Sequence, residues 1–280
     1  MNKLDRDQVL AHLKQLPSLP LAVSELLASF AEEAVDVDRI SRLIAHDQGL
    51  TARVLRVANS SFYGLQSRVG TIHDAVVILG FRAVRSMVLA VGMSGVFRAD
   101  QCPGFVTRSY LRHCAATGLA ARALAAISGH NPELAFTGGI LHDIGELVLA
   151  ANFPVQYAEV LAYRAKHDCF LVQAERDLLG LDHAEVGGLL AETWRFPPML
   201  HGAVAEHHVP AGAAAGSLAD LIHVADALAH ALGLAHAADE MVMPVERTAW
   251  LRLGLDSAKI AALPAMIERE LEETCQVLSA

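Results

Sequence analysis

Histidine and aspartate are the residues whose types and spacing could support chemistry in this chain, beginning with the doublet His142-Asp143. The doublet lies in the apolar run Gly139–Gly145, with leucine before it and isoleucine after it. Burying a carboxylate without a partner is costly, so we expect Asp143 to have a cation, a hydrogen-bond donor or a metal nearby. A hydrogen-bonded pair in a protein core explains the doublet equally well, so the doublet alone does not establish a metal site.

Five further residues of the same two types stand at intervals along the chain and enlarge the candidate site. They are His113, His183, His207, His208 and Asp226. Imidazole and carboxylate groups are ligands of Fe, Mn and Zn, and helices packed in a bundle bring such side chains together from distant positions. A binuclear site needs about this many nitrogen and oxygen ligands, with one carboxylate able to bridge the two ions.

The elements that must position these residues are helices. Apolar residues recur at the spacing of one helix face along most of the chain, and no stretch alternates with period two for long enough to predict a strand. Thr71 is a plausible N-cap, and Gly80 ends the helix that it starts. We predict an all-α chain with helices near residues 19–30, 40–44, 50–58, 71–79, 84–91, 105–127, 132–151, 154–161, 170–179, 183–194, 199–206 and 218–232, and two more between 244 and 278.

The segment 98–104 is the best candidate for a boundary in the first half, because it combines Asp100, Pro103 and Gly104. We therefore predict an N-terminal helical subdomain over residues 1–100 and a second helical subdomain over 101–235, which carries the histidine and aspartate set. A C-terminal helical extension follows over 236–280. The two predicted helices of that extension meet near Gly254.

The composition excludes several classes of protein. Hydrophobic residues make up 53% of the 280 and charged residues 19%, which predicts a folded core. The net charge of −9 argues against nucleic-acid and anionic-membrane partners. The longest apolar stretch, 75–93, contains Arg82 and Arg85 and breaks at Gly80, so it predicts no membrane span. With no secretory signal at the N-terminus and four scattered cysteines, we expect a cytoplasmic protein with reduced thiols.

The order of these residues, His, His-Asp, His, His-His and Asp, resembles the HD superfamily and in particular the fuller ligand set of the HD-GYP phosphodiesterases. The whole chain looks most like an HDOD protein, the HD-related output domain of bacterial signal transduction. The segments that carry this resemblance, in order and spacing, are Leu16–Pro20, Ile44–Arg53, Val57–Gly64, Ala75–Gly80 and Leu181–Gly187. Together they cover roughly residues 16–234. The resemblance implies a multi-helix HD-superfamily-like bundle with an N-terminal helical subdomain.

The resemblance also implies a set of metal ligands, carried over position by position. They are His113, His142, Asp143, His183, His207, His208 and Asp226. Asp143 would be the bridging carboxylate, and the implied cofactors are one or two divalent transition metals, Fe, Mn, Zn or Ni. The alternative is a polar hydrogen-bond network that survives from an enzymatic ancestor. His223 and His230 lie one turn to either side of Asp226 and could orient it, but we predict that they lie on a solvated helix edge.

Two departures from the enzymes concern substrate binding. HD-GYP enzymes have a lysine three residues after the His-Asp aspartate, where this chain has Glu146. A carboxylate at that place would repel an anionic phosphodiester. The enzymes also follow their His-His pair with an acidic and Gly-Tyr-Pro segment, whereas His207-His208 is followed by Val209–Gly212. These departures argue against hydrolysis of cyclic dinucleotides.

The sequence therefore predicts a non-catalytic bacterial signal-transduction module that acts by protein–protein contact or by binding a small, nucleotide-type ligand. We expect its signalling partners to act in trans, because no receiver, diguanylate cyclase or DNA-binding segment accompanies it. The alternative is a metal-dependent phosphohydrolase acting on nucleotides or cyclic dinucleotides, with metals that activate water and bind the phosphoryl oxygens. A third reading is a scaffold in which the histidine cluster only stabilises the fold.

Overall fold

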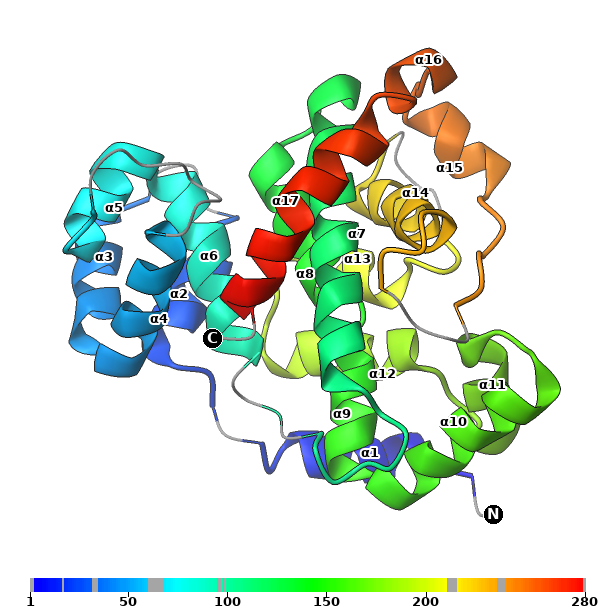
Figure 1. The fold of residues 1–280 in the computed structure, drawn as a ribbon. Coiled ribbons are helices and arrows are strands. Elements are labelled where there is room, and N and C mark those ends of the chain that lie inside the picture. The colour runs from blue at the N-terminus through cyan, green and yellow to red at the C-terminus, as the bar shows by residue number, and fades with distance from the viewer. Residues whose placement is uncertain are drawn as a thin grey trace.

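Every regular element in the computed structural model is a helix, within the described residues 3–16, 18–31, 35–59, 68–94, 97, 99–210, 216–235 and 240–278 (Figure 1). This confirms the all-α prediction. The helices are α1 Arg6–Leu13, α2 Leu21–Ala28, α3 Val37–His46, α4 Gln48–Ala58, α5 Ile72–Leu79, α6 Phe81–Ser94, α7 Thr107–Ser128, α8 Pro132–Leu141, α9 Ile144–Asn152, α10 Pro154–His167, α11 Leu171–Leu178, α12 His183–Thr193, α13 Pro198–Ala205, α14 Leu218–Ala231, α15 Arg247–Arg252, α16 Ser257–Ile260 and α17 Leu263–Leu278. The motif segment 60–64 lies outside the described residues.

The long helix α7 is the central element of the larger group of helices. It packs against α8, α14 and α17, and α17 continues past it to contact α6 and α4 (Figure 1). Helices α2–α6 form a separate group to one side. Helix α1 lies apart from that group and packs on α12. Just before α1, the Leu4 N–H donates a hydrogen bond at 2.8 Å to the carbonyl oxygen of Leu179, at the end of α11. The two groups of helices therefore meet where α6 packs on α8 and where α17 reaches from one group to the other.

Residues 132–151 form two helices rather than the single helix that the sequence predicts. Helix α8 ends at Leu141 and α9 begins at Ile144, with the doublet His142-Asp143 between them. Asp143 has φ −92° and ψ 17°, outside the helical range. The two helices pack against different neighbours. Helix α8 contacts α7, where Gly139 lies against Gly118, whereas α9 contacts α12. The break therefore places the doublet where these contacts meet.

The C-terminal stretch also differs from prediction, since it contains three helices, α15, α16 and α17, rather than two. The predicted stop at Gly254 is present, with φ 59°, but the chain turns again between α16 and α17. The start and the end of α5, which the sequence assigns to Thr71 and Gly80, are as predicted. The Thr71 side chain accepts a hydrogen bond from the Asp74 N–H, and Gly80 has φ 83° at the end of α5.

One segment of the described chain, Pro132–Asn152, is long and apolar enough to cross a membrane. It comprises α8 and α9, and 83% of its most apolar window is buried inside the protein. A core helix meets the same criteria of length and composition, so this segment is weak evidence for a span. The stretch 75–93 is divided between α5 and α6 at Gly80, as the sequence predicts.

The start of α12 is fixed by a capping box. The Glu185 N–H donates to Asp182 Oδ1 at 2.9 Å, and the Asp182 N–H donates to Glu185 Oε2 at 3.1 Å. Arg176 Nε also donates to Asp182 Oδ2, at 2.7 Å. These bonds satisfy backbone donors that the first helical turn leaves free. They therefore set the position of His183, the first residue of the helix.

Replacing Asp182 with alanine should lower the free energy of unfolding by about 1 kcal/mol, because the N-cap acceptor is lost. Asp182→Asn should lower it by less, since asparagine is also a good N-cap acceptor and only the charged contact with Arg176 is weakened. Urea unfolding of both variants measures the difference. Equal losses would show that the contact with Arg176, rather than the cap, stabilises this end of α12.

Candidate metal centre

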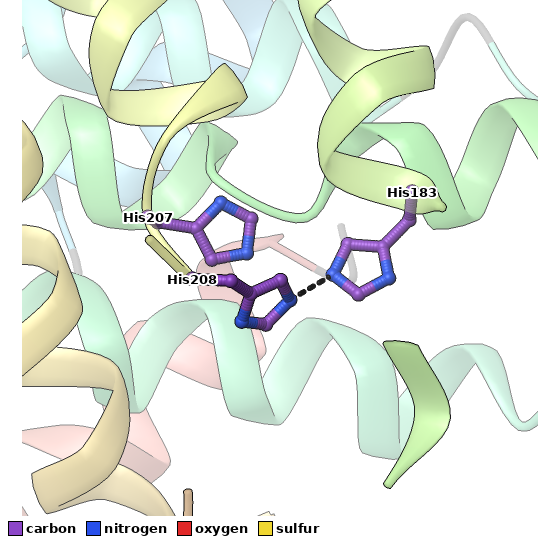
Figure 2. A group of neighbouring side chains, drawn as sticks. All are labelled: His183, His207 and His208. Atoms are coloured by element: carbon purple, nitrogen blue, oxygen red, sulfur yellow. Dashed lines mark hydrogen bonds between the residues drawn. The ribbon is translucent and has the colours of Figure 1, made fainter. Parts of the chain in front are cut away.

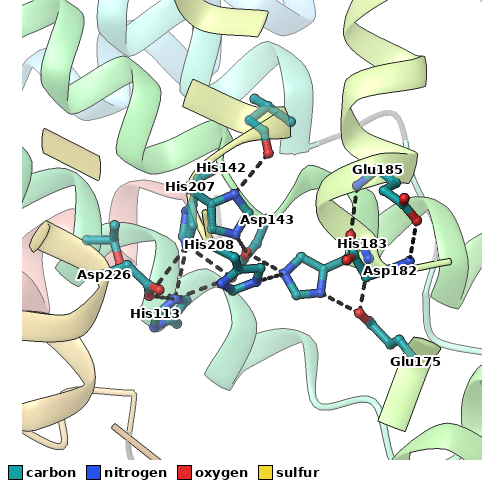
Figure 3. A network of polar contacts seen from close by, with 12 residues as sticks. His113, His142, Asp143, Glu175, Asp182, His183, Glu185, His207, His208 and Asp226 are labelled. Atoms are coloured by element: carbon teal, nitrogen blue, oxygen red, sulfur yellow. Dashed lines mark hydrogen bonds and ion pairs between the residues drawn. The ribbon is translucent and has the colours of Figure 1, made fainter. Parts of the chain in front are cut away.

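Five places in the fold supply the predicted histidines and aspartates, and the structure brings all of them together (Figure 3). Helix α7 carries His113, the α8–α9 break carries the doublet, α12 begins with His183, the turn after α13 carries His207-His208, and α14 carries Asp226. All of them are buried except His208, which is partly buried. The resulting cluster is His113, His142, Asp143, His183, His207, His208 and Asp226.

Asp143 lies at the centre of the cluster and contacts four histidines. Its Oδ1 lies 3.3 Å from the Nε2 atoms of both His183 and His207. Its Oδ2 lies 3.1 Å from His142 Nε2 and 3.3 Å from His113 Nε2. Each carboxylate oxygen therefore faces a different pair of imidazole nitrogens, which is the arrangement of a carboxylate that bridges two ions.

The remaining ligand candidates fall on the two sides of Asp143. On one side, His113 Nε2 lies 3.1 Å from Asp226 Oδ1 and 3.2 Å from His142 Nε2. On the other side, Figure 2 shows His183, His207 and His208 around a common point, with His183 Nε2 and His208 Nε2 2.7 Å apart. We call these the Asp226 side and the His208 side of the cluster.

Three histidines have their Nδ1 atoms occupied by hydrogen bonds outside the cluster. His142 donates from Nδ1 to the Gly139 carbonyl oxygen at 2.8 Å, His207 donates to the Val204 carbonyl oxygen at 2.9 Å, and His183 donates to Glu175 Oε2 at 2.7 Å. A neutral imidazole that carries its proton on Nδ1 has a lone pair on Nε2. In all three rings that lone pair faces Asp143, and this orientation is typical of metal-bound histidine.

This donor set fits a metal, because lone pairs and carboxylate oxygens face one another without hydrogens between them. His207 Nε2 and Asp226 Oδ1 are buried and make no hydrogen bond within the described residues, although Asp143 Oδ1 lies 3.3 Å from the first and His113 Nε2 lies 3.1 Å from the second. Lone pairs at such distances repel unless a cation lies between them. A divalent ion or a proton would remove that repulsion.

The pKa values of the cluster show that protons on its histidines compete with a metal for the same ligand atoms. Burial would raise the pKa of Asp143, but the His142 charge and the contacts with His113, His142 and His183 hold it well below its usual value. Burial would lower the pKa of His113, but contacts with Asp143 and Asp226 raise it to about 10. The same two carboxylates raise the pKa of His142 to about 9 against the effect of burial. Metal binding would therefore displace protons and should weaken as the pH falls.

Glu175 is a residue of the site that the sequence did not indicate. Its side chain is fully buried on α11, and its Oε2 accepts hydrogen bonds from the His183 N–H at 3.0 Å and from Nδ1. Its Oε1 accepts a hydrogen bond from the Tyr157 hydroxyl at 3.1 Å. The α11 helix is amphipathic, and a carboxylate at a buried position of such a helix was the signal available in the sequence.

The prediction that His223 and His230 lie on a solvated edge is wrong. His223 is buried, donates from Nδ1 to the His207 carbonyl oxygen at 2.7 Å, and accepts from the Glu246 N–H on Nε2 at 2.8 Å. It therefore holds the turn that carries His207-His208. His230 Nε2 lies 3.3 Å from Asp226 Oδ1, at the cluster itself. Both residues face the bundle because α14 is buried on most of its circumference.

Replacing Glu175 with glutamine should weaken metal binding on the His208 side by about 10–100-fold, because the carboxylate no longer fixes the His183 tautomer. Glu159→Gln, an exposed change on α10, is the matched control and should bind as the wild type does. Calorimetric titration of the metal-free protein measures both. Wild-type affinity in Glu175→Gln would contradict a positioning role for this carboxylate.

A cavity of about 390 Å³ lies against the cluster, and its lining includes His113, Asp143, His183, His208 and Asp226. Most of the remaining wall is apolar, and it consists mainly of Phe105, Val106, Leu161, Phe170, Leu171, Val172, Met241 and Met243. The size and the mixture of apolar wall and convergent polar groups are those of a small-molecule site.

The charged groups of the cavity other than the cluster are Glu146, Arg164 and Glu240. Burial and the nearby Asp143 charge raise the pKa of Glu146 to about 8. Glu146 also has a carboxylate oxygen within 4.8 Å of ligand atoms of Asp143 and His183. The position that holds a lysine in the enzymes is therefore a carboxyl group beside the cluster, and the basic side chain of the lining, Arg164, comes from α10.

One protein-family model matches the part of the chain that contains most of this fold and cluster. Residues 16–210, which are more than two thirds of the chain, match the model of the HDOD domain. The chain belongs to the HDOD family. The matched region of this HDOD protein contains six of the seven predicted ligands and ends before Asp226.

Solved structures have the same fold as this HDOD protein. An HDOD domain protein of unknown function from Geobacter sulfurreducens is 22% identical, with a TM-score of 0.82 and coverage of 98% of this chain and 99% of that one. A Shewanella amazonensis protein, described by inference as a phosphohydrolase, is 32% identical, with a TM-score of 0.74 and coverage of 96% and 97%. A Marinobacter aquaeolei protein, described by inference as a signal transduction protein, is 21% identical, with a TM-score of 0.78. The match covers all of this chain and 62% of the Marinobacter chain.

The curated relative is longer than this chain. It is an uncharacterized protein of Treponema pallidum, 25% identical over 200 residues, which are 70% of this chain. The match spans only 38% of the Treponema protein. The similarity therefore concerns one region of that protein.

Proposed function

We propose that this HDOD protein is a signal-transduction module that binds divalent metal at the cluster and a small phosphate-bearing ligand in the cavity, without turning the ligand over. The observation that carries the proposal is the convergence of imidazole lone pairs and the Asp143 carboxylate on one wall of the 390 Å³ cavity. Signalling proteins that recognise the bound state would act in trans.

His113, His142 and Asp226 would hold an ion on one side of Asp143, and His183, His207 and His208 would hold an ion on the other. Bound ions would supply positive charge and Lewis acidity to phosphate oxygens in the cavity. Without bound ions, the positive charges of His113 and His142 are neutralised by their contacts with Asp143 and Asp226, so the cluster offers little net positive charge to a ligand. Glu240 and Arg164 are the remaining charged groups of the lining, and their charges oppose each other. We therefore expect an anionic ligand to bind only when metal is present.

The lack of turnover is inferred from Glu146. A lysine at this position would contribute a cation to a phosphodiester, whereas a carboxyl group lying close to Asp143 and His183 offers only acceptor oxygens once it is ionised. The apolar wall can still bind the organic part of a ligand. The apolar wall and the cluster thus suffice to bind a ligand, whereas the cation that would assist hydrolysis is absent at Glu146.

Metal analysis of protein purified without an affinity tag tests the proposal first. We expect one or two Fe, Mn, Zn or Ni ions per chain. Calorimetric titration with inorganic phosphate and with nucleoside monophosphates should then show binding to the metal-loaded protein and none to the chelator-treated protein. A metal content near zero after growth and reconstitution with each ion would overturn the proposal and favour a scaffold in which the cluster only stabilises the fold.

The second candidate function is a metal-dependent phosphohydrolase, and two observations favour it. All seven predicted ligands lie together in one cluster, and five of them line the cavity. The Shewanella relative, at 32% identity over nearly the whole chain, is described by inference as a phosphohydrolase. Turnover of nucleotides, cyclic dinucleotides and a chromogenic phosphodiester with added Mn(II) or Fe(II) decides between the two functions. Activity that disappears in Asp143→Asn would replace the non-catalytic proposal.

A further inference from the structure

His230 and Glu240 form a pair at the edge of the cluster, outside the seven predicted residues. His230 follows Asp226 by about one turn of α14, and its Nε2 lies 3.3 Å from Asp226 Oδ1. Its Nδ1 lies 3.3 Å from Glu240 Oε1. Its ring stacks on that of His113, with the centroids 4.4 Å apart. His230 therefore lies between a carboxylate of the cluster and a carboxylate of the cavity lining.

Imidazole nitrogens surround Asp226 Oδ1 without forming hydrogen bonds to it. His113 Nε2 lies 3.1 Å away, His230 Nε2 3.3 Å and His142 Nε2 3.7 Å. This oxygen is buried and makes no hydrogen bond within the described residues. Ligand atoms of His113, Asp226 and His230 all lie within 4.8 Å of one another. Atoms at these distances without hydrogen-bond geometry are not bonded to one another, and a histidine–aspartate–histidine group this close together could ligate one cation.

Glu240 gives His230 the tautomer that a metal ligand requires. When Nδ1–H donates to the Glu240 carboxylate, the lone pair of Nε2 is left facing Asp226. His183 has the same arrangement, with Glu175 in the place of Glu240. A carboxylate that accepts from the far nitrogen of a ligating histidine is a common feature of metal sites. The competing explanation is a structural ion pair, in which a doubly protonated His230 lies between two carboxylates.

We propose that His230 is an additional metal ligand on the Asp226 side of the cluster and that Glu240 is its positioning residue. This inference rests on the proposed metal-binding function. Glu240 belongs to the segment 240–246, which has no regular secondary structure and lines the cavity through Met241 and Met243. The Glu246 N–H donates to His223 Nε2 at 2.8 Å and holds the other end of the segment on α14. Metal binding on this side therefore stabilises the segment that forms one wall of the cavity.

The test is a Co(II) titration of the full chain, in which calorimetry gives the affinity and visible absorption reports the ligands of the bound ion. We expect His230→Ala and Glu240→Gln each to weaken binding of one ion by about 10–100-fold, and His230→Ala to change the absorption spectrum of that ion. The control is a histidine–glutamate pair at the surface, His201 and Glu192, whose atoms lie 3.7 Å apart. His201→Ala and Glu192→Gln should bind as the wild type does.

Unchanged affinity and spectrum in both site variants would overturn the inference in favour of the structural ion pair. Far-UV circular dichroism monitors folding, and if His230→Ala unfolds, the isosteric Glu240→Gln decides the question. The wild type separates this inference from the proposed function. A wild type that binds Co(II) together with variants that bind equally well rejects only the role of His230, whereas a wild type that binds no metal rejects both.

Discussion

Replacing Asp143 with asparagine should remove bound metal from both sides of the cluster, with affinities at least about 100-fold lower than in the wild type. The reason is that Oδ1 faces His183 and His207 while Oδ2 faces His113 and His142, so one carboxylate serves both ions. The asparagine amide can donate to imidazole lone pairs on one side, so we expect the variant to fold. Elemental analysis and calorimetric titration measure the loss.

Asp177→Asn, an exposed change on α11, is the matched control and should keep the wild-type metal content. Retention of one full ion in Asp143→Asn would show that Asp143 ligates a single ion rather than bridging two. Wild-type binding at both sides would show that Asp143 is not a ligand.

Replacing Gly145 with alanine should destabilise the fold and weaken metal binding together. A Cβ at this position of α9 would overlap the carbonyl oxygen of His183 and would lie 2.8 Å from Gly187 N, both backbone atoms of α12. Backbone atoms cannot rotate away, so α9 and α12 would have to separate. Overpacking of this kind costs about 1–3 kcal/mol, and the separation would move His183 away from Asp143.

Gly202→Ala on α13 is the control, because its Cβ would meet nothing within 4 Å. Alanine has the higher helix propensity, so this change should raise the free energy of unfolding by up to about 1 kcal/mol. Urea unfolding of the metal-free proteins measures stability, and calorimetry measures metal affinity. A Gly145→Ala variant as stable as the wild type would contradict the close approach of the two helices.

The spacing of apolar residues was sufficient to predict most of the helical elements, because the period of one helix face is a local property of the chain. Single-residue stops such as Gly80 were also predictable, since a left-handed φ favours glycine wherever it occurs. Helix limits were less certain where tertiary contacts compete with local preference. Residues 132–151 read as one apolar helix, but packing of Gly139 on α7 and Gly145 on α12 breaks it at the doublet.

The sequence by itself indicated seven of the histidines and aspartates of the candidate site, because their order matches an HD-type ligand set. Only the tertiary structure decided how they divide around Asp143 and which nitrogen of each ring faces it. It also brought in Glu175, His230 and Glu240, whose roles depend on a hydrogen bond to a ring nitrogen rather than on a motif. The Nδ1 atoms of His142 and His207 are held by carbonyl oxygens three residues earlier, and those of His183 and His230 by carboxylates on neighbouring segments. Only the packing of helices that are far apart in the chain, α7, α12 and α14 around the α8–α9 break, turns the opposite nitrogens of these rings toward one cluster.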